Sequence, residues 1–223
     1  MPNLDNKRKL YSAPRHPYYV TAPDYRRTSA GIRVLHLLCH ALNSIGEEAY
    51  VYPTETHPAL NTPLVTPELI ERHKAAGREP IVVYPEVVPG NPRKAASVVR
   101  YVLNRAGLLG GDSVHAETEL IFGFGLNALP DGADPQNILF LPPIDTAIFN
   151  NRDNPDDHQR SGALLYPGRH QAALSQYPKL AAEATLITYS WPESHEALAS
   201  LLRRSEVVYC FESTTTSIWG FCD

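Results

Sequence analysis

The sequence predicts an α/β protein whose sheets are built from parallel strands. Short strand patterns rich in Val, Ile and Tyr alternate with longer helix patterns along most of the 223 residues, as in proteins made of strand–helix–strand units. The run "PIVVYPE" (80–86) is apolar almost without a break, which is typical of a parallel strand buried on both faces. Many of the 20 prolines stand between these patterns, where they favour short connections.

The first strand–helix–strand unit is the best defined. A strand is expected within "YYVTAPDY" (18–25), and in the helix that follows, apolar residues recur at helical spacing from Ile32 to Leu42. Ser29 can cap this helix and Gly46 can end it. Further helices are expected at 66–77 and 93–107, and further strands at 47–53, 80–86, 117–125 and 137–143.

The helix predicted at 93–107 depends on one pattern. In "RKAASVVRYVLNRAG", an apolar face is formed at helical spacing by Ala95, Val98, Val99, Val102 and Leu103.

The polar, acidic stretch "NNRDNPDDHQRSG" (150–162) is the best candidate for a linker. After it, strands are expected at 163–168, 184–190 and 206–212, and helices at 171–182, 192–205 and from 213 onward. The predicted division is therefore a polar N-terminal tail (1–17), a Rossmann-like parallel-sheet domain (18–149), the linker, and a second Rossmann-like unit (163–223). The second unit is expected to be incomplete, because it has about half the length needed to cover both faces of its sheet.

Composition excludes several functional classes. Hydrophobic residues make up 43% of the chain, which is enough for a packed core. The net charge of −4, without long runs of one sign, argues against nucleic acid as the main partner. Cys39, Cys210 and Cys222 fit no zinc spacing and indicate reduced thiols in a cytoplasmic protein. No run approaches the ~18 apolar residues of a membrane span.

Isolated metal and nucleophile motifs do not support a hydrolase or a metalloenzyme. His36 and His40 share one side of a helix, but no Glu follows His36, and packing or surface roles are favoured over a metal site. "HAE" (115–117) lacks the cysteines of a zinc deaminase. Neither a G-x-S-x-G nor a P-loop motif occurs.

Polar residues at strand ends are the main candidates for a binding site. In "YRRTSAG" (25–31), two arginines and Gly31 stand where a helix begins, and helix N-termini attract phosphate or sugar hydroxyls. "YPGRH" (166–170) offers Gly168 for close approach and Arg169 for phosphate. "FESTTTS" (211–217) places Glu212 and several hydroxyls at another strand end. Each stretch also has an ordinary explanation as a turn or a helix cap.

At another strand end, a binding role and a structural role are again both possible interpretations. Glu86 is the last residue of the run 80–86, and Gly90 and Asn91 lie in the turn after it. In open α/β sheets ligands bind at the carboxyl ends of strands, so these residues are candidates for binding an acceptor hydroxyl or a sugar. Asn91 before Pro92 can instead cap a helix.

Together these stretches resemble a glycosyltransferase with two Rossmann-like domains (the GT-B type), similar to the class named glycosyl transferases group 1. The similarity is carried by 28–52, by 81–107, by "FLPPIDTAIFN" (140–150), by "LLYPGRH" (164–170) and by 191–223.

The resemblance implies a sugar transfer from a nucleotide-diphosphate sugar to a glycan or polysaccharide acceptor, with no separate cofactor or metal. By position, Gly31 would face the transferred sugar, Glu86 would be the catalytic candidate, and Gly90 and Asn91 would contact substrate. The donor would be held by Gly168, Arg169, Glu212 and Asp223. The family's usual Lys shortly after the Arg is missing here, since Lys179 lies ten residues away. A peripheral association with a membrane and the oligomeric state stay open.

Two other functions stay open from the sequence. An oxidoreductase or epimerase would require G-x-G-x-x-G after the first strand, and "DYRRTSAGIR" has a single Gly there. A non-catalytic, transferase-like binding module is favoured by the short second unit.

Overall fold

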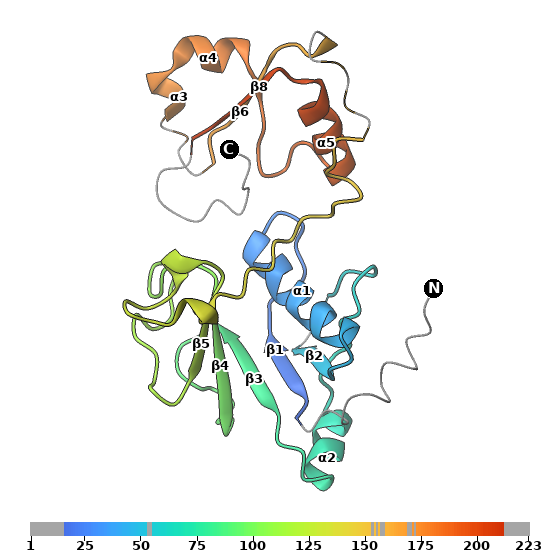
Figure 1. Ribbon diagram of the computed structural model, residues 1–223, viewed down its shortest axis with the longest axis vertical. Helices are drawn as coiled ribbons and strands as arrows, with labels where there is room; N and C mark the ends of the chain where they lie inside the picture. The colour runs from blue at the N-terminus through green and yellow to red at the C-terminus, as the bar shows by residue number, and fades with distance from the viewer. Residues whose placement is uncertain are drawn as a thin grey trace. The chain divides into compact units, whose positions relative to one another are not determined.

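The computed structural model describes residues 16–52, 55–152, 154, 156, 159–168, 171 and 173–211, and of Ala173 only the backbone. The chain divides into two compact units, Met1–Pro143 and Ile144–Asp223 (Figure 1). Each unit is built on its own sheet, and all described strand pairs are parallel. The α/β class with parallel sheets is therefore confirmed.

The first unit contains a five-stranded sheet in the order β2-β1-β3-β4-β5, which fans out in Figure 1. Because β2 and β3 lie on either side of β1, the chain reverses direction across the sheet after β2. This is the doubly wound arrangement of Rossmann-like folds. The strands are β1 (Tyr18–Thr21), β2 (Ala49–Tyr52), β3 (Ile81–Pro85), β4 (Ser97–Val102) and β5 (Leu120–Gly123).

Helices α1 (Ala30–Ser44) and α2 (Pro67–Ala75) join the first three strands, as predicted. Right-handed crossovers in opposite directions place them on opposite faces of the sheet. Ser29 occupies the N-cap position of α1 without a side-chain cap, whereas the Thr66 hydroxyl accepts from the Leu69 amide. Leu69 packs into a cluster with Tyr19 and Val82, which forms the core under α2.

The helix predicted at 93–107 is wrong. Residues Ser97–Val102 form β4, which pairs with β3 and β5. The run Val98–Val99 is β-branched, and its spacing to Val102 fits a strand buried on both faces as well as a helix. Because β4 lies between β3 and β5, its pairing with both strands stabilises the strand conformation over the helix.

The strand predicted at 137–143 is also wrong. Only Ile138 forms an isolated bridge with Gly123, and the Leu139 amide donates to the Gly123 carbonyl. Pro142 and Pro143 have no amide hydrogen to continue the pairing. The segment instead runs toward α1, where the buried Arg33 donates to the Pro143 carbonyl.

The connections 86–96 and 103–119, before and after β4, contain no helix. The fully buried Arg100 of β4 organises both of them. Its Nε and Nη2 donate to the two carboxylate oxygens of Glu119 at 2.8 and 2.9 Å. Nη1 donates to the carbonyls of Pro85 and Val88, and Nη2 to that of Gly90.

A second polar cluster fixes α2 to the sheet. The Tyr19 hydroxyl lies 2.6 Å from Nδ1 of His73, and Nε2 of His73 lies 3.0 Å from Glu48. Arg78 and the Tyr50 hydroxyl also donate to Glu48. Burial works to raise the pKa of Glu48, but the hydrogen bonds from Arg78, Tyr50 and His73 outweigh it and leave that pKa below its ordinary value.

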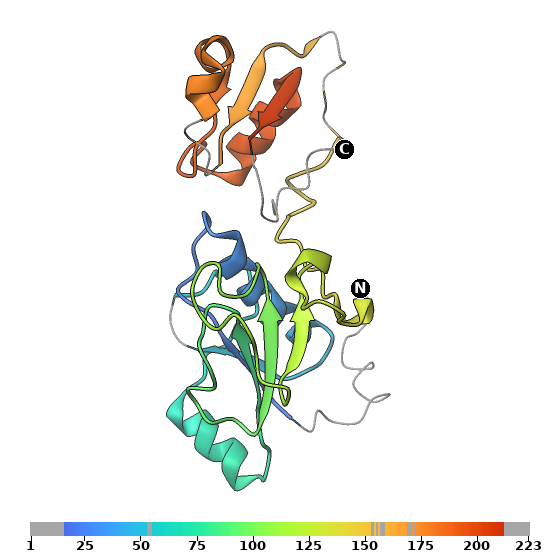
Figure 2. The same cartoon turned by 90° about the vertical axis from the view of Figure 1, so that its left-hand side faces the viewer.

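The second unit contains a three-stranded sheet in the order β7-β6-β8. Its strands β6 and β8 lie side by side in Figure 2. The helix predicted at 171–182 is divided in two, α3 and α4, and the helix predicted from 213 onward lies outside the described residues. The elements are β6 (Ala163–Tyr166), α3 (Ala173–Gln176), α4 (Pro178–Glu183), β7 (Thr185–Leu186), α5 (His195–Arg204) and β8 (Val207–Cys210).

We predict that Arg100→Met destabilises the first unit by about 3 to 5 kcal/mol, because it leaves the buried Glu119 carboxylate and three carbonyls without their donor. Urea denaturation measures the change. The control Arg105→Met, at an exposed position, is expected to change stability by less than about 0.5 kcal/mol. Equal losses in the two variants would refute the role given to Arg100.

We predict that Glu48→Gln costs about 1 to 2 kcal/mol near neutral pH through the lost charged hydrogen bonds. Because the folded-state pKa of Glu48 is below its ordinary value of 4.5, its contribution is present above pH 4.5 and is lost as the pH falls through the folded pKa. The stability difference between wild type and variant should therefore shrink in acid. A difference that stays constant from pH 7 down to about pH 3 would contradict this linkage.

Candidate functional site

The order of the strands points to one place in the first unit. In a doubly wound sheet, ligands bind at the carboxyl edge where the strand order reverses, and here this point lies between β1 and β3. Helix α1 follows β1 after the stretch 22–29 and begins at this edge. This point is therefore bordered by the stretch 22–29, by the start of α1 and by Glu86 after β3.

The first turn of α1 has the features of an anion site, but only in part. The Ser29 side chain makes no cap bond, so it leaves first-turn amides to other partners. Arg26 is exposed at the same turn. A Cβ on Gly31 would meet Leu103 Cδ1 at 3.5 Å, an ordinary contact, so packing within the protein does not require glycine there. Close approach of a ligand would be a separate reason for it.

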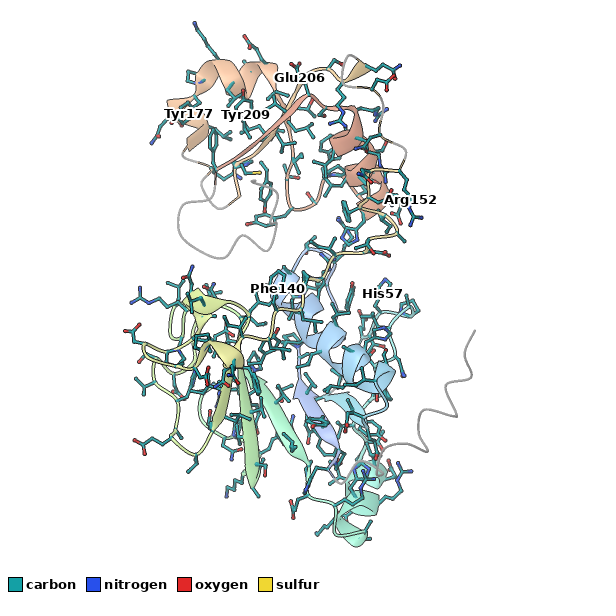
Figure 3. All side chains as sticks on the ribbon, viewed as in Figure 1. His57, Phe140, Arg152, Tyr177, Glu206 and Tyr209 are labelled. Carbon is teal, nitrogen blue, oxygen red and sulfur yellow. The ribbon has the colours of Figure 1, made fainter. Side chains whose placement is uncertain are left out.

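An aromatic cluster stands beside this turn, and sequence reasoning did not find it. The Tyr25 ring lies edge-on to His36, with centroids 5.4 Å apart, and against His57 at 4.8 Å. The Tyr25 amide donates to the Glu55 carbonyl, which joins the connections after β1 and β2. His57, labelled in Figure 3, is half-buried. No spacing in the sequence links Tyr25 to His57, because the parallel sheet brings them together.

Of this cluster, His36 is the fully buried member. Its Nε2 donates to the Pro23 carbonyl at 2.9 Å, and its Nδ1 is buried without a hydrogen-bond partner. Burial lowers the pKa of His36, although the bond to Pro23 opposes the shift. Burial also lowers the pKa of Arg33, one turn earlier on α1. The cluster therefore contains an imidazole whose protonation is disfavoured by burial, and the buried Arg33 lies one turn away on the same helix.

Glu86 lies at the expected edge, but its carboxylate is engaged by the backbone. The residue is 3% exposed, and Oε2 accepts from the Leu103 amide at 3.0 Å, which ties the end of β3 to the end of β4. Burial raises the pKa of Glu86, and hydrogen bonds from backbone amides, including those of Leu103 and Asn104, work against the increase. A Cβ on Gly111 would come within 2.0 Å of the Glu86 carbonyl, so the connection 103–119 packs closely over it. These contacts favour a structural role; the catalytic assignment stays a prediction.

Gly90 and Asn91 are likewise held within the protein. The Gly90 amide donates to Asp112, and its carbonyl accepts from Arg100. Asn91 Oδ1 accepts from the Ala95 amide at 3.0 Å, and its Nδ2 donates to the Ala95 carbonyl at 2.9 Å, which closes a turn. No helix begins there, so the predicted helix cap is wrong. Glu86 and Gly31 both approach Leu103, whereas Gly90 and Asn91 belong to the Arg100 network.

In the second unit, Gly168 is buried two residues after β6 and has φ +54°, a conformation that favours glycine. This agrees with a tight turn at the strand end. Arg169, Glu212 and Asp223, the other residues expected to hold a donor, lie outside the described residues.

The described residues contain no group of three or more His, Cys, Asp or Glu side chains that could hold a metal ion. His36 is bonded to Pro23, and Nδ1 of His40 accepts from the Asn61 amide, so the two do not converge. Cys39 is a buried free thiol, and burial raises its pKa to about 12. Among the same residues, no helix has the length and apolar character to cross a membrane.

Comparison of the chain with protein-family models, curated proteins and solved structures found no match.

We predict that Glu86→Ala lowers stability by about 2 kcal/mol, because the buried Leu103 amide loses its acceptor. Glu117→Ala removes an exposed carboxylate from the neighbouring connection and should change stability by less than about 0.5 kcal/mol. Thermal unfolding of the two variants measures the difference. An unchanged melting temperature for Glu86→Ala would argue against the structural role and for a catalytic one.

Proposed function

We propose that the protein is a glycosyltransferase that uses a nucleotide-diphosphate sugar as donor and a glycan as acceptor. The observation that carries the proposal is that one chain holds two units, each with its own wholly parallel described sheet. Each unit then has a carboxyl edge at which a small molecule can be bound. Two such units fit an enzyme that handles a donor and an acceptor.

The second unit is assigned to the donor. The turn after β6 brings Gly168, with its positive φ, directly before Arg169. A glycine lets the backbone approach a ligand closely, and a guanidinium can pair with two phosphate oxygens at once. In the transfer, negative charge develops on the departing diphosphate, and such a cation stabilises it without a metal.

The first unit is assigned to the acceptor. The start of α1 offers amides without a Ser29 side-chain cap, and Tyr25 and His57 form an aromatic wall next to it. Amides and rings of this kind suit sugar hydroxyls and the apolar faces of sugars.

A non-catalytic binding module is the second candidate, and the position of Glu86 favours it. The residue considered for catalysis is 3% exposed, and its Oε2 accepts from the Leu103 amide, so a substrate has little access to its carboxylate. Donor turnover by the 223-residue chain, measured as release of nucleoside diphosphate, separates the candidates. Turnover supports the transferase, and tight binding without turnover supports the module.

The test of the donor assignment is calorimetry with uridine and guanosine diphosphates. We predict that Arg169→Ala weakens binding by about tenfold or more through the lost charge-assisted hydrogen bonds. Arg152→Ala, at an exposed position of the same unit that is labelled in Figure 3, is the matched control and should bind like wild type. Undiminished affinity in Arg169→Ala would remove the phosphate role from this arginine.

A further inference from the structure

Aromatic side chains gather at the carboxyl edge of the sheet in the second unit. All three strands of this sheet are parallel, so the residues that follow them meet at one edge. Each strand end supplies at least one ring, and the connection between α3 and α4 supplies another. The rings are those of Tyr166, Tyr177, Tyr189, Trp191 and Phe211.

Two pairs of these rings are in contact. Tyr177, labelled in Figure 3, is stacked on Phe211 with centroids 5.1 Å apart. Tyr166, the last residue of β6, lies edge-on to Tyr189 at 6.1 Å. The Phe211 amide donates to the Tyr166 carbonyl, which continues the pairing of β6 with β8 up to this edge. The rings are therefore supported by the sheet.

The loop after β7 carries Tyr189 and Trp191, and hydrogen bonds within the loop hold it closed. The Thr188 amide donates to the Trp191 carbonyl at 2.9 Å, and the Trp191 amide donates to the Thr188 hydroxyl at 3.0 Å. Ile187, just before this loop, is buried, and its amide donates to the Leu165 carbonyl of β6. Tyr189 and Trp191 thus project from a short, anchored turn.

The exposure of these two side chains indicates what they can do. Tyr189 is 49% exposed and Trp191 is 40% exposed, so each is about half covered by protein and half open to solvent. A ring that was only a core residue would be covered, and an unsupported surface ring would be more exposed. Half-exposed rings on an anchored loop are suited to stack against the flat face of a ligand.

The polar groups of the loop indicate which ligand would fit. The connection between β7 and α5 (187–194) carries one charged side chain, the exposed Glu193, so the loop offers no cation for a phosphate, whereas the carboxylate can accept hydrogen bonds from hydroxyls. Thr188 and Ser190 are exposed, and their hydroxyls lie 3.4 Å apart. The Thr188 hydroxyl also accepts from the Trp191 amide, and since a hydroxyl has one donor and two acceptor positions, both keep capacity for a ligand. Backbone groups of Thr188 and Trp191, which could read the edge of a nucleobase, are already bonded to the loop itself. Rings flanked by hydroxyls match the C–H face and the hydroxyls of a neutral sugar.

We propose that the loop after β7, with Tyr189 and Trp191, is a stacking platform for a pyranose ring of a neutral oligosaccharide. Tyr166 positions the Tyr189 ring through their edge-on contact. This goes beyond the proposed function, because it assigns a neutral glycan to the second unit by contacts that do not involve the diphosphate or Arg169.

The experiment uses the fluorescence of Trp191. The chain has two tryptophans, so Trp219→Phe in the full chain leaves Trp191 as the single indole reporter. This protein is titrated with a panel of neutral oligosaccharides of two to six hexose units, and in parallel with uridine and guanosine. We predict a saturable change of Trp191 emission with at least one neutral oligosaccharide. Adding Tyr189→Ala should weaken that binding by about tenfold or more.

Tyr209→Ala is the matched control, since Tyr209 is also 40% exposed but lies on β8, outside the loop (Figure 3). It should bind the same oligosaccharide like the parent protein. Trp191→Leu, tested by calorimetry, should lose binding while its melting temperature stays close to that of the parent.

The proposal is overturned if no oligosaccharide of the panel changes Trp191 emission, or if nucleosides alone change it. It is also overturned if Tyr189→Ala and Tyr209→Ala bind equally well. Since none of these outcomes involves Arg169, failure here leaves the donor assignment standing. Failure of the Arg169→Ala test likewise leaves the platform standing.

Discussion

The first unit depends on one buried guanidinium. A parallel sheet is normally covered on both faces by the helices that cross from strand to strand. The connections before and after β4 contain no helix, so their backbone cannot satisfy its own hydrogen bonds as a helix would. Arg100 supplies the donors instead, to carbonyls of Pro85, Val88 and Gly90, and its charge is balanced by Glu119. Burying this positive charge costs free energy. The cost is offset because the N–H groups of the guanidinium have hydrogen-bond acceptors and its charge is paired with a carboxylate.

This arrangement also determines what is available at the carboxyl edge. In the connection 103–119, Gly111 packs against the Glu86 carbonyl. The Glu86 carboxylate is bonded to the Leu103 amide. The end of β3 is thus closed by protein groups. At the end of β1, by contrast, the α1 turn has no Ser29 side-chain cap, and Tyr25 and His57 face each other. The polar chemistry of this unit therefore lies on the β1 side of the switch point.

Much of the fold was predictable from local patterns. Helices α1 and α2 and the strands around them follow from apolar spacing and from caps at Thr66 and Gly46, which act within a few residues. β4 was not predictable in this way, because its valines fit both periods and its central Arg100 suggests a solvent-exposed position. Only the partners of Arg100, which come from other connections of the fold, explain why an arginine is fully buried in a strand.

The candidate site shows the same division between local and long-range information. The helix start with Gly31 and the strand ends with Glu86 and Gly168 could be found in the sequence, because a glycine or a carboxylate next to an apolar pattern is a local signal. Whether Glu86 is free or bonded depends on Leu103, which a parallel crossover brings beside it. The pairing of Tyr25 with His57, and of Tyr166 with Tyr189, likewise depends on which strands are neighbours.

The two assignments made for the second unit rest on different physical forces. A diphosphate is held by charge, which an arginine after β6 can supply and which weakens with salt. A neutral sugar is held by stacking and hydroxyl contacts, which the loop after β7 supplies and which salt hardly affects. Because Arg169 follows β6 in the sequence and the two rings follow β7, the groups belong to different connections, and we expect their energies to add. A glycan and a nucleotide could then be bound by one small unit without competing for the same side chains.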